Sequence, residues 1–242
     1  MKRMGIFFGV LIAAFFAGTA FAENVDSIKF RDIDWLKPET EVKEITDKID
    51  GAHESWYMGV EENARIDSWY RQWENMYTDY NIESAGTILR YDDVSVAGYN
   101  SELEISFMYP VENGEVIHNT EESLFYMAQY SIVDIEDYES AYEDIVNKLT
   151  SLYGTPTDKS YYNTMDELDS PKGSLWTASD GSLVWAGIYY SSYNEKYDAC
   201  WIVYAAPNTE EMLTSLAEAL QNESYLNEAS NREENSSNTD GL

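Results

Sequence analysis

Few residues in this chain are of the types that perform catalysis near neutral pH. Its 242 residues include two histidines, His53 and His118, and one cysteine, Cys200. A Ser-His-Asp site needs a histidine held between a nucleophile and a carboxylate, and no G-x-S-x-G string supplies a strained serine. We therefore expect neither histidine to be a catalytic residue. Both are predicted to be solvated loop residues, and Cys200 a small buried residue of a strand.

Metal and phosphate motifs are also missing from the sequence. His53-Glu54 begins an H-E-x-x-H string, but Tyr57 stands where the second histidine belongs. Neither G-x-x-x-x-G-K-[ST] nor G-x-G-x-x-G occurs. Acids are dense at Asp92-Asp93 and over residues 134–144, yet no D-x-[DN]-x-[DN]-G loop accompanies them. These patterns predict no cofactor and no metal, and they leave a calcium-dependent module as an alternative function.

The acidic residues outnumber the basic ones three to one. Forty-five Asp and Glu against 15 Lys and Arg give a net charge of −30. This sign argues against a nucleic-acid partner, because phosphate contacts need clustered Lys and Arg. Glycosidases need only two carboxylates at a set separation, so a carboxylate-dependent hydrolase acting on extracellular glycans is a further alternative.

Tyrosine is the other abundant residue of functional interest, with 20 copies. Tyr190, Tyr193 and Tyr197 fall near the end of one predicted strand and the loop after it. A tyrosine offers a flat apolar face and a hydroxyl at low entropic cost, which suits recognition surfaces. We predict these three residues as a binding surface for a protein or a glycan, against the simpler reading of strand-end residues half packed on the surface.

The first 22 residues have the organisation of a secretory signal peptide. Lys2 and Arg3 precede an apolar run over residues 5–17, and Ala20-Phe21-Ala22 places small residues where a signal peptidase reads. Cleavage after Ala22 leaves 13 cations against 45 acids, a net charge of −32. No later segment reaches the roughly 20 apolar residues of a spanning helix. We expect the mature chain to be soluble, without a membrane span, and secreted or extracytoplasmic. Association with the cell envelope is an alternative location.

Apolar periodicity predicts both helices and strands in the mature chain. One strand is predicted to have a dry face with Leu103, Ile105, Phe107 and Tyr109, and a wet face with Glu102, Glu104, Ser106 and Met108. The next strand is predicted to place Leu124, Tyr126, Ala128, Tyr130 and Ile132 on one side. Leu152, Leu213 and Leu216 are predicted on the buried faces of their helices. The helices begin after Pro38, at residues 61–80, at residues 137–153 with a stop at Gly154, and at Asn208. The strands include 87–91, 94–97, 103–109, 124–132, 183–190 and 199–205, and Asn113-Gly114 has the residues of a hairpin turn.

The helices and strands occur in runs rather than in strict alternation. This order predicts an α+β fold with antiparallel sheet packed by helices. We expect one domain over residues 23–221, with 34–132 and 137–205 as two helix-then-sheet units, and a disordered acidic tail over residues 222–242.

One sequence segment, together with the order of the predicted helices and strands, resembles known proteins. Residues Tyr142 to Pro156, YEDIVNKLTSLYGTP, end a helix in Tyr-Gly-x-Pro and precede Trp176 and an Asp-Gly turn. This pattern, with Trp35 before a helix start, resembles one common in uncharacterised exported bacterial α+β proteins. In arrangement, the chain also resembles the secreted β-lactamase-inhibitor-like fold, whose two units each pack helices on one sheet. The resemblance brings no functional motif, so it implies a fold and no binding residue.

These features together favour an exported, non-catalytic binding or interaction protein whose partner is an extracellular protein or a glycan. Three features of the sequence favour this function: it predicts a hydrophobic core, it places many tyrosines in loops, and it contains none of the catalytic motifs considered above. Whether the chain is an enzyme is left open by the sequence.

Overall fold

The computed structural model describes residues 25–49, 53–58, 86–156, 173–191 and 196–237. The helices in these ranges are α1 (Glu39–Thr46), the 3₁₀ turn η1 (Thr120–Glu122), α3 (Tyr138–Tyr153) and α4 (Thr209–Ser237). The strands are β1 (His53–Met58), β2 (Gly86–Val96), β3 (Tyr99–Met108), β4 (Val111–Glu112), β5 (Glu115–Val116), β6 (Leu124–Ile132), β7 (Gly173–Thr177), β8 (Leu183–Ser191) and β9 (Lys196–Ala205). The predicted helix over residues 61–80 lies outside the described residues.

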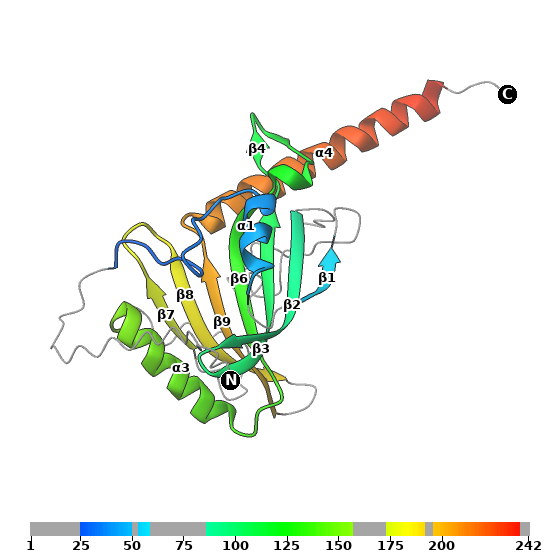
Figure 1. The fold of residues 1–242 in the computed structure, drawn as a ribbon. Helices are drawn as coiled ribbons and strands as arrows, with labels where there is room; N and C mark the ends of the chain where they lie inside the picture. The colour runs from blue at the N-terminus through cyan, green and yellow to red at the C-terminus, as the bar shows by residue number, and fades with distance from the viewer. Residues whose placement is uncertain (1–24, 50–52, 59–85, 157–172, 192–195, 238–242) are drawn as a thin grey trace, which may run out of the picture.

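Seven of these strands form one antiparallel sheet in the order β1-β2-β3-β6-β9-β8-β7 (Figure 1). The short strands β4 and β5 pair with each other as a separate hairpin. Strands of both predicted units, 34–132 and 137–205, belong to the same sheet and meet where β6 pairs with β9. The predicted α+β class with an antiparallel sheet is confirmed.

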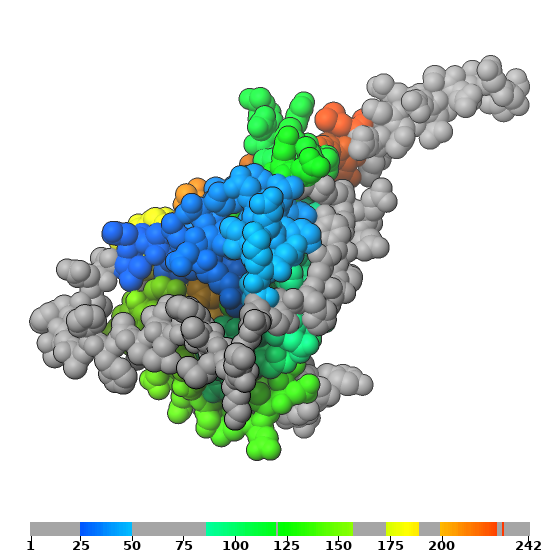
Figure 2. All heavy atoms as spheres, in the orientation of Figure 1, coloured from blue at the N-terminus to red at the C-terminus, as the bar shows by residue number. Residues whose placement is uncertain are grey.

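The first face of the sheet carries the larger core. We define this face by Leu103, Ile105 and Phe107 of β3, which alternate as predicted and are buried. Tyr109, predicted on the same face, lies beyond the end of β3 and packs in the core of the second face instead. Residues 25–49 and helix α3 cover it, and Figure 2 shows the N-terminal residues spread over this side of the molecule. This face is dry because alternate strand residues and the facing helix residues are all apolar.

The second face is covered by α4 at one end. It carries Glu102, Glu104, Ser106 and Met108, the residues between those of the first face on β3. The sequence predicts a wet face here, and the two glutamates are partly exposed. Ser106 and Met108, however, are buried, and Met108 belongs to the core cluster that contains the α4 residues.

Strand β6 departs from the single alternation that the sequence predicts. A bulge lies opposite the step from Ser106 to Phe107, so Tyr126 is an extra residue in the pairing. As a result, Tyr126 packs in the second-face core, whereas Ala128 and Tyr130 pack in the first-face core. A bulge moves every following side chain to the other face, and the apolar composition of this strand does not reveal it.

Helix α3 has the predicted ends. The Asp137 side chain accepts a hydrogen bond from the Ser140 backbone N–H at 3.0 Å, and this bond lowers the pKa of Asp137. Gly154 has φ 80°, and its N–H donates to the Thr150 carbonyl oxygen at 2.9 Å. Leu152, predicted on the buried face, is exposed, whereas Leu149 and Tyr153 of the same end of the helix pack in or against the first-face core.

Helix α4 is packed in its first half and projects from the body in its second half (Figure 1). Leu213 and Leu216 are fully buried, as the periodicity predicts. The helix continues through residues 222–237, for which the sequence predicts a disordered tail. Extension of an anchored helix adds one hydrogen bond per residue without a new nucleus, which accounts for helical backbone there. Tyr225 and Leu226 are exposed, in accord with the lack of apolar periodicity.

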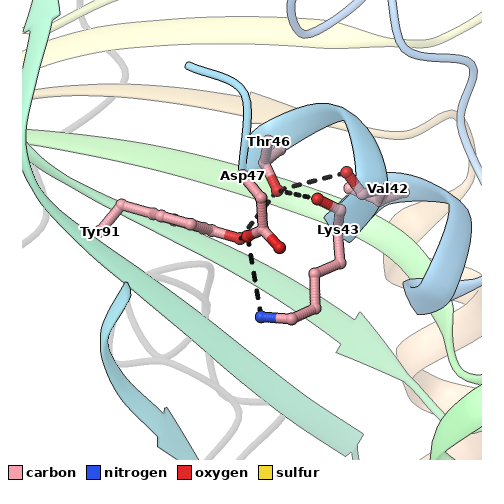
Figure 3. A network of polar contacts seen from close by, with 5 residues as sticks. All are labelled: Val42, Lys43, Thr46, Asp47 and Tyr91. Carbon is pink, nitrogen blue, oxygen red and sulfur yellow. Dashed lines mark hydrogen bonds and ion pairs between the residues drawn. The ribbon is translucent and has the colours of Figure 1, made fainter. Parts of the chain in front are cut away.

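Helix α1 is attached to the sheet by a buried tyrosine (Figure 3). Tyr91 of β2 is 1% exposed, and its hydroxyl donates to Asp47 Oδ1 at 2.9 Å. The same hydroxyl oxygen lies 2.8 Å from Thr46 Oγ1. Thr46 Oγ1 also bonds the Val42 carbonyl oxygen at 3.2 Å, and Lys43 Nζ lies 3.7 Å from Asp47 Oδ1. One phenol thus ties the C-terminal turn of α1 to the core.

We predict that Tyr91→Phe lowers the free energy of unfolding by about 1–2 kcal/mol, because the polar groups of Thr46 and Asp47 lose a partner. Urea denaturation of the mature protein measures this change. Tyr225→Phe removes an exposed hydroxyl on α4 and is the matched control, with no change expected. Equal stabilities of Tyr91→Phe and the parent would contradict the role of the hydroxyl.

We also predict that Cys200 does not react with a thiol reagent in the native protein. Cys200 is fully buried in β9, and burial raises the pKa of its thiol to about 12. The colorimetric reagent DTNB should therefore react only after denaturation. A Ser151→Cys variant, exposed on α3, is the positive control. A native Cys200 that reacts as fast as the unfolded chain would refute the buried position.

Candidate functional site

The predicted tyrosine surface is described only in its backbone. Tyr190 of β8 and Tyr197 of β9 lie opposite each other in the hairpin, just past a register shift at Tyr189/Tyr190. Tyr193 lies outside the described residues. The pairing brings two of the three residues to neighbouring positions on adjacent strands, and a binding role for the three stays a prediction.

The two histidines occupy different environments. His118 is exposed, and its Nε2 lies 2.9 Å from Glu223 Oε2 on α4. The other oxygen of Glu223 accepts from the Val116 backbone N–H at 3.3 Å, so this glutamate joins the β4–β5 region to α4. His53 begins β1, where the sequence predicts a loop, and lies opposite Asp92 of β2.

The carboxyl groups with shifted pKa values do not suit acid catalysis. The Lys29 ammonium lowers the pKa of Asp34 through a hydrogen bond, and hydrogen bonds from Ser140 lower that of Asp137. Burial acts to raise the pKa of Asp180, but hydrogen bonds from Ser182 lower it on balance. A general acid at neutral pH needs a raised pKa. Within the described ranges, no three His, Cys, Asp or Glu side chains are grouped to hold a metal ion.

The second face of the sheet has two parts of different chemistry. At one end, α4 lies over Met127 and Val203, and Leu213 and Leu216 complete an apolar core. Farther along the same strands, β3 presents Glu104 to this face. Two candidate sites follow from this division, one at the border of α4 and one on the polar part of the sheet.

The first candidate is an apolar groove beside α4, which we call the α4 groove. It has a volume of about 310 Å³. Its lining comes from the end of β3, from β4, from the start of β6 and from the first turns of α4: Met108, Tyr109, Pro110, Val111, Leu124, Glu211, Met212 and Ser215. Tyr109, Met108 and Leu124 belong to or pack on the same core as α4, which fixes the floor of the groove.

Local sequence explains why the chain leaves the sheet at this groove. Pro110 lies two residues after Met108, the last residue of β3, and has no N–H for a strand partner. The chain then turns at Asn113 and Gly114, with φ of 53° and 84°, as predicted for this hairpin. These breaks lift β4 and β5 out of the main sheet and place them against α4.

The surroundings of the groove are acidic. Exposed glutamates lie on the β4–β5 hairpin, on η1 and on the first turn of α4: Glu112, Glu115, Glu121, Glu122, Glu210 and Glu211. Glu211 is the one glutamate of the groove's lining. An apolar groove with a carboxylate in its lining selects against anionic ligands and favours a ligand that combines apolar and cationic groups.

The second candidate is a set of side chains that we call the polar row: Arg90, Glu102, Glu104, Gln129 and Ser131. Arg90 Nη2 lies 3.0 Å from Glu102 Oε2 and 3.0 Å from Glu104 Oε1. Glu104 is opposite Gln129 in the register, and Gln129 Nε2 donates to Ser131 Oγ at 3.2 Å.

Sequence motifs predicted neither of the two candidate sites. The α4 groove depends on where the last helix crosses the sheet, which no local pattern encodes. The polar row had a signal, because Gln129 is a lone amide in the otherwise apolar strand LFYMAQYSI, and Glu102 and Glu104 alternate with buried residues.

Two findings complete the description of the site. None of the helices in the described ranges has the length and apolar character needed to cross a membrane. Comparisons of the chain with protein-family models, with curated proteins and with solved structures found no match. The resemblance to the β-lactamase-inhibitor-like fold therefore stays a prediction.

Proposed function

We propose that this protein is exported and non-catalytic, and that it binds an extracellular protein through the α4 groove. The observation that carries the proposal is an apolar groove lined by one exposed glutamate, Glu211, with further exposed glutamates on the β4–β5 hairpin and on the first turn of α4. Its volume of about 310 Å³ lies at the lower end of ligand pockets, roughly 300–1,000 Å³. That size suits apolar side chains of a peptide better than a large cofactor.

The lining indicates the chemistry of the partner. Met108 at the end of β3 and Met212 of α4 both line the groove. Methionine side chains are flexible and polarizable and adapt to apolar groups of different shape. Glu211 at the margin would pair with a lysine or arginine. The fitting partner is therefore a peptide segment with an apolar anchor residue flanked by basic residues.

The overall charge of the protein also favours a basic partner. A chain with net charge −30 attracts cationic partners over a long range and speeds their association at low salt. The same charge repels nucleic acid and anionic lipid surfaces. The glycan hydrolase and the calcium-dependent module remain alternatives without a site of their own among the described residues.

We predict that the mature protein binds peptides with a central leucine, phenylalanine or methionine flanked by lysines, and does not bind the same peptides flanked by glutamates. Glu211→Lys and Met212→Glu should each weaken binding by about tenfold or more, equivalent to about 1.4 kcal/mol. Isothermal titration calorimetry at low and at physiological salt measures the affinities.

Glu143→Lys provides the matched control for this experiment. Glu143 is exposed on α3, over the first face of the sheet, so the variant makes the same charge change away from the groove. Equal losses in Glu143→Lys and Glu211→Lys would show that net charge alone governs binding. Affinities weaker than millimolar for every lysine-flanked peptide would reject the groove as a peptide site.

Export is tested separately. We expect that the full chain, expressed in a secreting bacterial host, is recovered outside the cytoplasm with Glu23 as its first residue. Mass spectrometry of the intact protein gives the mature N-terminus. Ala22→Asp, which removes a small residue at the cleavage position, should leave the leader attached. A cytoplasmic product that begins at Met1 would refute the export assignment.

A further inference from the structure

The half of helix α4 that leaves the body carries two large apolar side chains in solvent. Tyr225 is 61% exposed and Leu226 is 68% exposed. Both come after Leu220, which packs against the second-face core, and Figure 1 shows this part of α4 extending away from the sheet. Single exposed apolar residues are common on protein surfaces. Their position relative to the α4 groove is what gives these two a role.

Leu226 lies on the face of α4 that lines the groove. An α-helix has about 3.6 residues per turn, so residues about 11 or about 14 positions apart share a face. Leu226 follows Ser215 by 11 residues and Met212 by 14 residues, and both of these line the groove. Tyr225 follows the third lining residue of the helix, Glu211, by 14 residues. At a rise of about 1.5 Å per residue, Leu226 is about 21 Å from Met212 along the helix axis.

The part of this face between the groove and Leu226 is polar and acidic. Glu218 and Asn222 lie there, and both are exposed. Residues 209–226 of α4 include four glutamates and no lysine or arginine. Glu223 is engaged by His118 at 2.9 Å, next to the β4–β5 hairpin. The face therefore has an apolar contact at each end and a carboxylate and an amide between them.

This arrangement discriminates between possible partners. A second copy of the chain would bring a net charge of −30 against an acidic helix, and like charges in an interface are unfavourable. A partner helix places apolar side chains about 14 residues apart on one face, which matches the spacing from Met212 to Leu226. Two helices that cross at a shallow angle can maintain contact over about 20 Å. Cationic residues on the same partner face would complement Glu218.

We propose that the partner of the α4 groove is a basic amphipathic helix that packs lengthwise along α4. One apolar residue of this helix enters the groove beside Met212, and a second contacts Leu226 about four turns farther on. Lysine or arginine residues between the two pair with Glu218. This partner extends the proposed peptide binding, on which the inference rests, from the groove to the free half of α4.

Two probes titrated by isothermal calorimetry into the mature protein test this extension. The short probe is a lysine-flanked peptide with one central leucine, and the long probe is a lysine-rich helix of about 20 residues with two leucines about 14 positions apart. We expect the long probe to bind at least about tenfold more tightly than the short one. On binding of the long probe, amide exchange over residues 224–229 should slow at least about tenfold.

Leu226→Ala removes the second contact and keeps a residue that favours helix. It should weaken binding of the long probe by about fivefold or more and leave the short probe unchanged. Leu152→Ala on α3, where the leucine is also 68% exposed, is the matched control and should leave both probes unchanged. Met212→Glu should weaken both probes, because both use the groove.

The basic helix is rejected as the partner if the long probe binds no more tightly than the short one, or if Leu226→Ala leaves binding of the long probe unchanged. The groove as a peptide site survives that result if the short probe still binds. Failure of both probes rejects both proposals. A long probe with glutamates in place of lysines that binds equally well would contradict the basic character of the partner. A dimer of the protein that Leu226→Ala abolishes, without binding of the long probe, would assign the surface to a second copy instead.

Discussion

Leu213 and Leu216 of helix α4, both fully buried, hold that helix against Met127 and Val203 on the second face of the sheet. Burial of a leucine side chain contributes about 1.5–3 kcal/mol, so these contacts outweigh the surface ion pairs of the chain by a wide margin. They also determine how far α4 extends over the sheet. Because the apolar face of α4 ends near Leu220, the helix covers one end of the second face and then leaves the body (Figure 1).

The proposed α4 groove results from the place where the helix ends its cover. The α4 groove lies where the helix borders the end of β3 and the start of β6, and its lining is shared between α4 and the strands. The polar row lies on the same face, next to Val203 of the apolar core, and its Glu102 and Glu104 are partly exposed. The first face contributes no comparable surface in the described part of the chain, because residues 25–49 and α3 pack over its apolar side chains.

The sequence was a good guide wherever local patterns determine the structure. Alternation in β3, the Asp137 and Gly154 ends of α3, and the Asn113-Gly114 turn were all predicted and are observed. The same patterns also led to the correct fold class. Each of these features depends on hydrogen bonds or burial within a few residues, so the signal is local.

Long-range features were missed for an equally physical reason. The bulge at Tyr126 is an adjustment between two strands, and a single strand carries no sign of it. Helical backbone over residues 222–237 depends on an anchored segment before it, not on apolar periodicity. The candidate sites likewise arise from strands that are distant in the sequence. Gln129 could have been noticed as the one amide of its strand, but its neighbours on β3 and β9 are brought to it only when the sheet forms.

Amide hydrogen exchange of the mature protein, read by NMR along α4, tests the partial cover of the sheet most directly. The structure predicts slow exchange over residues 213–220, comparable to the central strands β6 and β9, and fast exchange over residues 224–237. Fast exchange throughout α4, with β6 and β9 still protected, would show that the helix does not cover the second face and would remove the basis of the groove.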